Sequence, residues 1–188
     1  MLLENRFTVP VPPDEVWNAL VDVERVVVFL PGASLQSITG DHFEGRVKVK
    51  VGPITMSFKG VANFSLKDNA ARRAVIHGAG KEIAGDGTAK GSMTMVVEET
   101  AGGSEVVLTT TLDITGKAAK FGRRMITDIA GRLVDQFAAA LTDDLTGGSD
   151  ALVEASGEGD EPEGVGRTAA PALQLLSWSH RKRGSESS

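Results

Sequence analysis

The stretch that decides the fold covers residues 116–141 and reads GKAAKFGRRMITDIAGRLVDQFAAAL. Its apolar side chains recur every three or four residues, which is the spacing of one face of an amphipathic helix. They are Ala118, Phe121, Met125, Ile129, Leu133 and Phe137. Charged residues interrupt the stretch every few positions, so it lacks the composition of a membrane span. At 1.5 Å per residue the helix is about 35–40 Å long, enough to cross a small domain.

The segments before this helix have the alternating pattern of strands. Residues 2–9 predict a first strand, and Pro13-Asp14-Glu15 then places a proline and two acids where a short helix begins. A second short helix follows Asp22 and ends at Pro31-Gly32. From residue 33 to residue 114 the pattern is that of further strands, and Gly52-Pro53 joins two long ones into a hairpin.

These elements predict an α+β fold, in which one curved antiparallel sheet of about seven strands wraps around the long C-terminal helix. The strands are expected to be antiparallel because every connection is too short for a crossover. Only the long helix is available to cover the apolar face of the sheet. In the second strand of this hairpin, the even positions from Ile54 to Leu66 carry the apolar side chains and are expected to face that helix.

Composition and charge restrict the class of protein. The chain has 188 residues, a formal net charge of -5 and no cysteine, which excludes disulfides, thiolate metal sites and a cysteine nucleophile. Residues 148–167 hold six acids against one arginine, so residues 1–147 are nearly neutral and show no basic excess for a nucleic acid. The N-terminal segment contains Glu4 and Asn5 where a signal peptide would be apolar, and we therefore expect a cytoplasmic protein.

The chain is expected to divide into three parts. Residues 1–146 form the ligand-binding domain, residues 147–171 form an acidic linker rich in Gly, Ser and Pro that we expect to be disordered, and residues 172–188 form a short amphipathic basic tail. In the tail an apolar group precedes a basic cluster, a pattern typical of a peptide that contacts a membrane surface or a partner protein. The residues are Leu173, Leu175, Leu176 and Trp178, then Arg181, Lys182 and Arg183.

No constellation for catalysis or metal binding stands out. His42, His77 and His180 lie in separate segments without metal-ligand spacing, and we expect them to be surface or hydrogen-bonded histidines. The Gly-Asp-Gly turn at 85–87 does not open a helix, which argues against a nucleotide site. The acidic pairs at 98–99 and 143–144 are expected to be solvated, as is the arginine pair at 123–124 on the polar helix face.

The methionines allow two interpretations. Met56, Met93 and Met95 share the inward strand face with Phe58, and Met125 belongs to the apolar helix face. Flexible thioethers can line a cavity that adapts to an isoprenoid or a ring. They can equally be ordinary core residues, and the residues alone favour that second interpretation.

Several motifs together resemble the CoxG family of carbon monoxide dehydrogenase subunits, within the START-like, helix-grip superfamily (SRPBCC). They are PPDEVWNALVDVERVVVFLPG at 12–32, GRVKVKVGPITMSFKG at 45–60, the turn at 85–87, GKAAKFGRRMI at 116–126 and QFAAAL at 136–141. The resemblance covers about residues 1–145. It implies a helix-grip fold with an elongated apolar cavity between the sheet and the long helix.

The resemblance also implies a role for the chain. It is expected to be a non-catalytic lipid-binding protein that binds an isoprenoid quinone (menaquinone or ubiquinone) without a covalent bond. Its partner would be an aerobic molybdenum-containing carbon monoxide dehydrogenase or a related hydroxylase, with electron transfer at the inner face of the cytoplasmic membrane and membrane association through the tail. The expected ligand-binding residues are Phe29, Leu30, Val47, Val49, Met56, Phe58, Met93, Met95, Phe121, Met125 and Ile129.

Two other roles remain open. One is a recruitment or assembly factor that docks a molybdenum hydroxylase on the membrane without carrying a ligand. The other is a hydrolase or cyclase of the wider superfamily, which is less favoured because no catalytic dyad is visible.

Overall fold

The structure, a computed structural model, describes residues 1–51 and 54–153. Seven strands and three α-helices make up this part of the chain. The strands are β1 (Leu2–Val9), β2 (Ala33–Thr39), β3 (His42–Val51), β4 (Ile54–Asp68), β5 (Arg73–Glu82), β6 (Thr88–Thr100) and β7 (Gly103–Ile114). The helices are α1 (Pro13–Val21), α2 (Val23–Val27) and α3 (Gly122–Val153), and a 3-10 helix, η1 (Ala118–Phe121), precedes α3.

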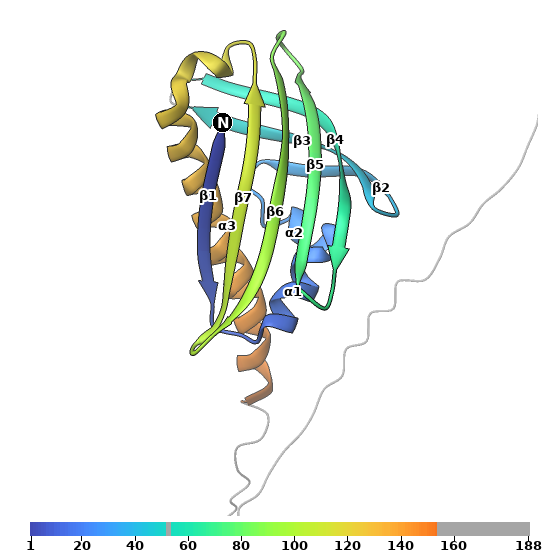
Figure 1. Ribbon diagram of the computed structural model, residues 1–188, viewed down its shortest axis with the longest axis vertical. Coiled ribbons are helices and arrows are strands. Elements are labelled where there is room, and N and C mark those ends of the chain that lie inside the picture. Colours follow the sequence, from blue (N-terminus) through green and yellow to red (C-terminus); the bar gives the residue numbers. More distant parts are fainter. Residues whose placement is uncertain (52–53, 154–188) are drawn as a thin grey trace, which may run out of the picture. The chain divides into compact units, whose positions relative to one another are not determined.

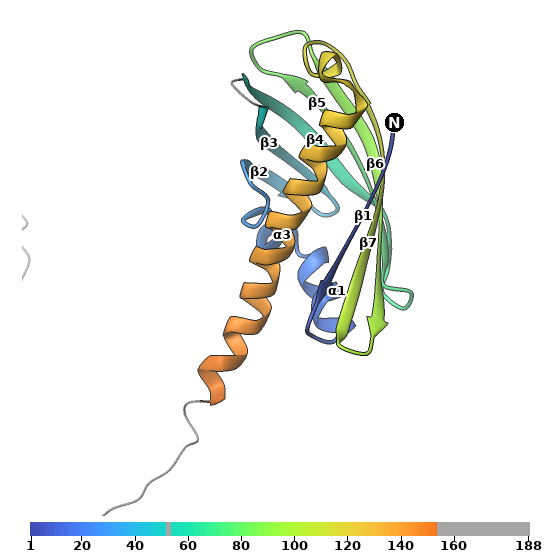
Figure 2. The ribbon, with the colours of Figure 1, turned by 90° about the vertical axis from the view of Figure 1, so that its left-hand side faces the viewer.

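All seven strands form one antiparallel sheet in the order β1-β7-β6-β5-β4-β3-β2. Figures 1 and 2 show the sheet curving around one side of α3, with α1 and α2 beside the C-terminal half of that helix. The expected α+β architecture, with about seven strands, two short helices after the first strand and a long helix at the end, is confirmed. The strands could be predicted because apolar and polar residues alternate along them in the sequence.

The long helix differs from the expected span of residues 116–141 at both ends. At its start, residues 118–121 form the 3-10 helix η1, and Gly122 has a φ of 73°. This left-handed conformation is favourable for glycine, and it separates η1 from the regular turns of α3. At the other end α3 continues to Val153, so residues expected to begin the linker are helical.

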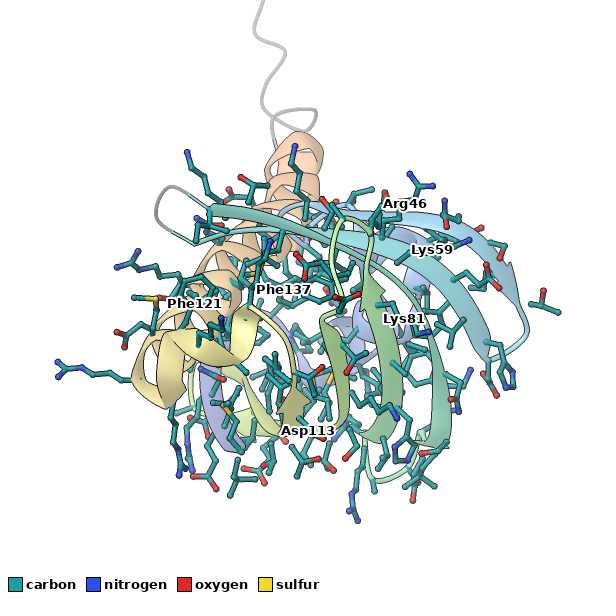
Figure 3. The ribbon with its side chains drawn as sticks, turned by 90° about the horizontal axis from the view of Figure 1, so that it is seen from above. Arg46, Lys59, Lys81, Asp113, Phe121 and Phe137 are labelled. Atoms are coloured by element: carbon teal, nitrogen blue, oxygen red, sulfur yellow. The ribbon has the colours of Figure 1, made fainter. Side chains whose placement is uncertain are left out.

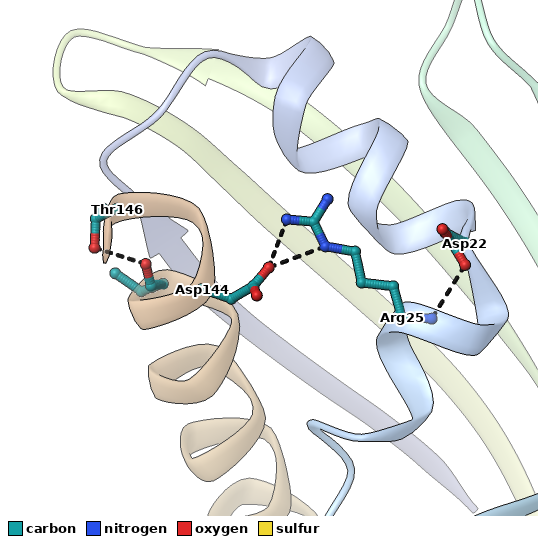
Figure 4. A network of polar contacts seen from close by, with 5 residues as sticks. Asp22, Arg25, Asp144 and Thr146 are labelled. Atoms are coloured by element: carbon teal, nitrogen blue, oxygen red, sulfur yellow. Dashed lines mark hydrogen bonds and ion pairs between the residues drawn. The ribbon is translucent and has the colours of Figure 1, made fainter. Parts of the chain in front are cut away.

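The continuation of α3 brings an acidic residue into a defined contact. The Nε of Arg25 in α2 donates to Oδ2 of Asp144 at 2.9 Å, and the backbone N–H of Arg25 donates to Oδ1 of Asp22 at 3.1 Å (Figure 4). Asp144 is exposed, as expected for a solvated charge, and the structure adds this ion pair, which the sequence did not predict. Leu145 packs against the main core on the same turn, so both contacts hold this turn of α3 against the domain.

A β-bulge in β4 corrects the expected orientation of one leucine. The pairing of β4 with β5 shifts between Phe64 and Leu66, after which Leu66 pairs with Val75. Before the bulge, Phe64 pairs with the inward Ile76. Leu66 is consequently exposed on the outer face and does not face α3 as strict alternation had suggested.

The expected tail contacts, Leu173, Leu175, Leu176, Trp178, Arg181, Lys182 and Arg183, lie outside the described residues. Within the described ranges, none of the helices combines the length and the apolar composition that crossing a bilayer requires.

Candidate ligand-binding site

The inner face of the sheet, which faces α3, carries two separate apolar clusters. The larger cluster joins α1, the end of β1 and the C-terminal half of α3, where Val16, Val106 and Leu141 are almost fully buried. Phe137 of α3 lies between two other rings, edge to face, with centroids 5.9 Å from Phe7 and 6.5 Å from Phe29. Figure 3 shows Phe137 in the space between α3 and the sheet.

The smaller cluster lies at the opposite end of the sheet. Its buried members are Met56 of β4 and Ala118 of η1. Five partly buried side chains pack against them, namely Val49, Phe58, Ile114, Phe121 and Ile129. The cluster thus ties η1 and the first turns of α3 to the β3–β4 hairpin and to the end of β7.

Between the two clusters, six positions on the inner face of β4, β5 and β6 carry either no side chain or a single methyl group. The strand register places these positions in two neighbouring rows, Ala62, Gly78 and Gly91 in one and Gly60, Gly80 and Ala89 in the other. We call them the small-residue rows. They are bounded by the row of Phe64, Ile76 and Met93 on the larger cluster's side.

Two of the four glycines in these rows are required by the close approach of neighbouring strands. A Cβ at Gly60 would lie 2.4 Å from the carbonyl oxygen of Ala79, and a Cβ at Gly91 would lie 2.5 Å from that of Thr111. Such distances are far shorter than any real contact, so only glycine permits the neighbouring strands to approach there. The six positions on β4, β5 and β6 therefore carry only hydrogen or methyl groups, while the Leu112 side chain of β7 lies 3.5 Å from where a Cβ of Gly91 would be.

The inner face is also incompletely covered on the side of β2 and β3. Val47 lies opposite Phe58 in the register, and so belongs to the inner face, yet it is 42% exposed. Leu30, just after α2, is exposed as well. Because α3 packs chiefly along β1, the inner face of β3 is open to solvent at Val47, whereas Phe43 and Val49 on either side pack against the two clusters.

Eight of the eleven expected ligand-binding residues are divided between the two clusters, and the exposed Leu30, Val47 and Met125 belong to neither. Phe29, Met93 and Met95 belong to the larger cluster. Val49, Met56, Phe58, Phe121 and Ile129 belong to the smaller one. Sequence reasoning missed the small-residue rows between them, although the alternation of Gly78 and Gly80 within a strand pattern was a usable signal.

Met125 occupies a different environment from the other methionines. It is 44% exposed, whereas Met56 and Met95 are buried. The neighbouring Ile126, three residues before Ile129 on the same helix, is the residue of that turn which is buried. Met125 therefore lies at the edge of the helix face and not at its centre.

Two surface hollows are formed by described residues, and neither includes the expected ligand-binding residues. One, of about 320 Å³, lies between the α1–α2 connection and the β2–β3 turn, where Val21, Asp22, Ile38 and Phe64 line it. The other, of about 310 Å³, lies between the Pro10–Pro13 segment and the β6–β7 turn.

The described residues show no cluster of three His, Asp or Glu side chains that could hold a metal ion. His42 and His77 are exposed on the outer face, and the register places both beside Asn63. One buried carboxylate oxygen has no hydrogen-bond partner within the described part. It is Oε2 of Glu82, which is packed against Gly85 and Gly87 in the β5–β6 turn.

Comparison with known families gives one match that covers most of the chain. The model of the CoxG family of carbon monoxide dehydrogenase subunits matches residues 6–146. No curated relative matches the sequence.

Solved structures with the same fold share little sequence with this chain. A conserved protein from Geobacillus kaustophilus has a TM-score of 0.70 at 15% identity, covering 78% of this chain and 96% of its own. The ZhuI aromatase/cyclase from Streptomyces sp. R1128 has a TM-score of 0.55 at 17% identity, covering 84% of this chain and 99% of its own. Ara h 8.0201 has a TM-score of 0.53 at 18% identity, covering 78% and 98% respectively. These likenesses establish the helix-grip fold.

Proposed function

The chain belongs to the CoxG family of carbon monoxide dehydrogenase subunits, and on that premise we propose that it is a non-catalytic carrier of an isoprenoid quinone. The quinone, a menaquinone or ubiquinone, lies between α3 and the inner face of the sheet. The carrier delivers it to or from a molybdenum-containing carbon monoxide dehydrogenase at the cytoplasmic side of the membrane.

The observation that carries this proposal is the pair of small-residue rows. The inner face has an aromatic and aliphatic cluster at each end, and six positions between them carry only hydrogen or methyl groups, a distribution that favours an apolar ligand beside α3. Protein interiors are otherwise packed to crystal-like density, so a core that omits six side chains calls for something to occupy the space. An elongated apolar molecule with flexible carbon units matches that requirement.

The residues at the two ends suit such a ligand. Met56 and Met93 present polarisable thioethers that adapt to a ring or to a branched chain. Phe58 and Phe121 offer ring faces at the smaller cluster, where a quinone ring could stack. Val47 and Leu30, exposed on the open side, give the ligand a path from solvent or from a lipid surface.

Ligand identification is the decisive test. The full-length protein is purified from its own host and examined by native mass spectrometry before and after organic extraction. We expect a bound species with the mass of an isoprenoid quinone, and we expect the extracted protein to take up the same quinone from doped vesicles. A protein that emerges empty and takes up no quinone would contradict the proposal.

The same experiment separates carriage from recruitment alone. A recruitment factor would associate with the dehydrogenase in a pull-down and still carry no quinone. A cyclase or hydrolase would instead convert a bound small molecule, and incubation with the extracted ligand would change its mass.

A further inference from the structure

The formal charges of the folded part are segregated along the sheet. Three segments, residues 46–59, 79–93 and 111–126, carry ten cations against three acids, a net charge of +7. The other residues of the range 1–147 carry six cations against fifteen acids, a net charge of -9. Residues 1–147 therefore look nearly neutral only because two opposite charges cancel.

The three positive segments meet at one end of the domain, the upper end in Figure 1. The backbone N–H of Ile83 donates to the carbonyl of Ser57 at 2.8 Å, which joins the end of β5 to β4. The N–H of Thr115 donates to the carbonyl of Thr88 at 2.9 Å, which joins the end of β7 to β6. Ala118 of η1 packs on Met56 at the same end.

We call this end the basic pole. All ten of its cations are exposed. They are Arg46, Lys48, Lys50, Lys59, Lys81, Lys90, Lys117, Lys120, Arg123 and Arg124. The four ion pairs found among the described residues involve none of them, although Asp113 lies opposite Lys90 in the register.

Three cations of the basic pole repel one another and so destabilise the sheet. Arg46, Lys59 and Lys81 lie directly opposite one another on β3, β4 and β5. Figure 3 shows them on the side of the strands away from Phe137. Like charges at opposed positions of neighbouring strands repel and destabilise the sheet. An anionic surface that covers this end would relieve the repulsion.

Exposed apolar side chains occur at the same end, on three different elements. Ile54 is the first residue of β4, Ile83 lies in the β5–β6 turn, and Met125 lies in the first turn of α3 beside Arg124. Each is exposed and close in sequence to a cation of the basic pole. Apolar residues surrounded by cations are the pattern of a surface that rests in a lipid headgroup region.

We propose that the basic pole docks on an anionic phospholipid bilayer, with the opposite end of the sheet, at the β6–β7 turn, directed away from it. Seven of the ten cations are lysines, and protein interfaces deplete lysine while favouring arginine and aromatic residues. Lysine serves well as a point charge toward phosphate headgroups. The basic pole lies next to the smaller cluster, but none of its ten cations is among the expected ligand-binding residues or the expected tail contacts, so this docking can fail while quinone carriage stands.

The first test measures binding of the full-length protein to vesicles. Wild type is expected to bind vesicles of equal phosphatidylcholine and phosphatidylglycerol and not vesicles of phosphatidylcholine alone, and added salt should weaken the binding. The variant Lys48→Gln/Lys50→Gln/Lys59→Gln is expected to bind on the order of 100-fold more weakly, since each cation near an anionic leaflet contributes a factor of about five.

A matched variant controls for net charge. Arg6→Gln/Arg73→Gln/Arg132→Gln removes the same number of exposed cations outside the basic pole. Its binding is expected to change less than threefold. Equal losses for the two variants would show a non-specific charge effect and would overturn the proposal. The proposal would also be overturned if wild type bound an acidic protein or duplex DNA but showed no preference for anionic over neutral vesicles.

A second test reports the orientation and excludes attachment through the tail alone. Because the chain has no cysteine, single-cysteine variants can carry an environment-sensitive fluorophore at one chosen position. A label at Ile83→Cys is expected to shift to shorter wavelength on anionic vesicles, whereas a label at Ala101→Cys, in the β6–β7 turn at the other end of the sheet, stays unchanged. Binding without a shift at position 83 would overturn the proposal.

Discussion

Replacing Gly78 with leucine is expected to weaken quinone binding without weakening the fold. Gly78 lies on the inner face of β5, within the small-residue rows. A Cβ at this position would lie 3.7 Å from Cβ of Ala62 and 3.9 Å from the carbonyl oxygen of Val61, both ordinary van der Waals contacts. Because its φ is not positive, a side chain also fits the backbone conformation.

The expected loss follows from the carbon atoms that the new side chain displaces. The leucine side chain excludes a similar number of ligand carbons, about four, from the inner face. Each buried methylene contributes about 0.8 kcal/mol, so the loss is about 3 kcal/mol. Since 1.4 kcal/mol corresponds to a factor of ten, the affinity should fall on the order of 100-fold. A glycine within a strand is itself unfavourable by about 0.5–1 kcal/mol, so the melting temperature should stay equal or rise.

The assay is calorimetric titration of the extracted protein with a short-chain menaquinone, beside thermal unfolding followed by circular dichroism. Ala79→Leu is the matched control, because Ala79 is the next residue of β5 and is exposed on the outer face. Its affinity should equal that of wild type. If Gly78→Leu folds and binds with unchanged affinity, the ligand does not lie over the small-residue rows.

Three further predictions concern stability and are measured by urea unfolding. Gly116→Ala should lower the free energy of unfolding by about 3 kcal/mol, because φ is 75° and the added Cβ would lie 2.5 Å from Cα of Gly87. Gly122→Ala, at a φ of 73° but with no atom within 4 Å, should lower it by less than half as much. Equal losses for the two variants would refute the steric argument. Asn69→Ala should cost about 1–2 kcal/mol, because it removes the acceptor of the Trp17 indole N–H, 3.1 Å away, and an unchanged midpoint would contradict this. Leu141→Ala should cost about 3 kcal/mol, since the side chain is fully buried, and a loss below 1 kcal/mol would show that the core collapses around it.

The elements of the fold could be predicted from the sequence because the pattern along each of them is local. The alternation in residues 104–114 predicts a strand, and the Gly52-Pro53 dipeptide between two alternating segments predicts the pairing of β3 with β4, both without knowledge of distant neighbours. The bulge at Leu66 could not be predicted in this way, because it depends on how β4 pairs with β5. One extra residue is enough to reverse the faces that follow it.

The limits of the long helix show a similar dependence on distant contacts. Sequence periodicity does not reveal that Gly122 adopts a left-handed φ. Nor does it reveal that Arg25, more than a hundred residues earlier, pairs with Asp144. An exposed ion pair contributes little, up to about 1 kcal/mol, so the burial of Leu145 against the core is the larger reason for the added turns.

The basic pole illustrates why charge counts mislead. Its cations come from three segments that are far apart in the sequence, and the sum over residues 1–147 conceals them. The segregation appears only when the register places Arg46, Lys59 and Lys81 in one row. Composition argued against a polyanion partner for the chain as a whole, whereas the fold concentrates the charge on one end.

The glycines of the inner face link the curvature of the sheet to the space beside α3. Gly60 and Gly91 cannot accept a side chain, because a Cβ would overlap a carbonyl oxygen of the next strand. Substitution at either glycine would change both the curvature of the sheet and the ligand site, so a loss of binding would not show where the ligand lies. Gly78 differs, since its neighbours lie at van der Waals distance. It is therefore the position at which volume can be changed while curvature is kept, and a binding loss confined to Gly78→Leu would assign the ligand to the space that the bending creates.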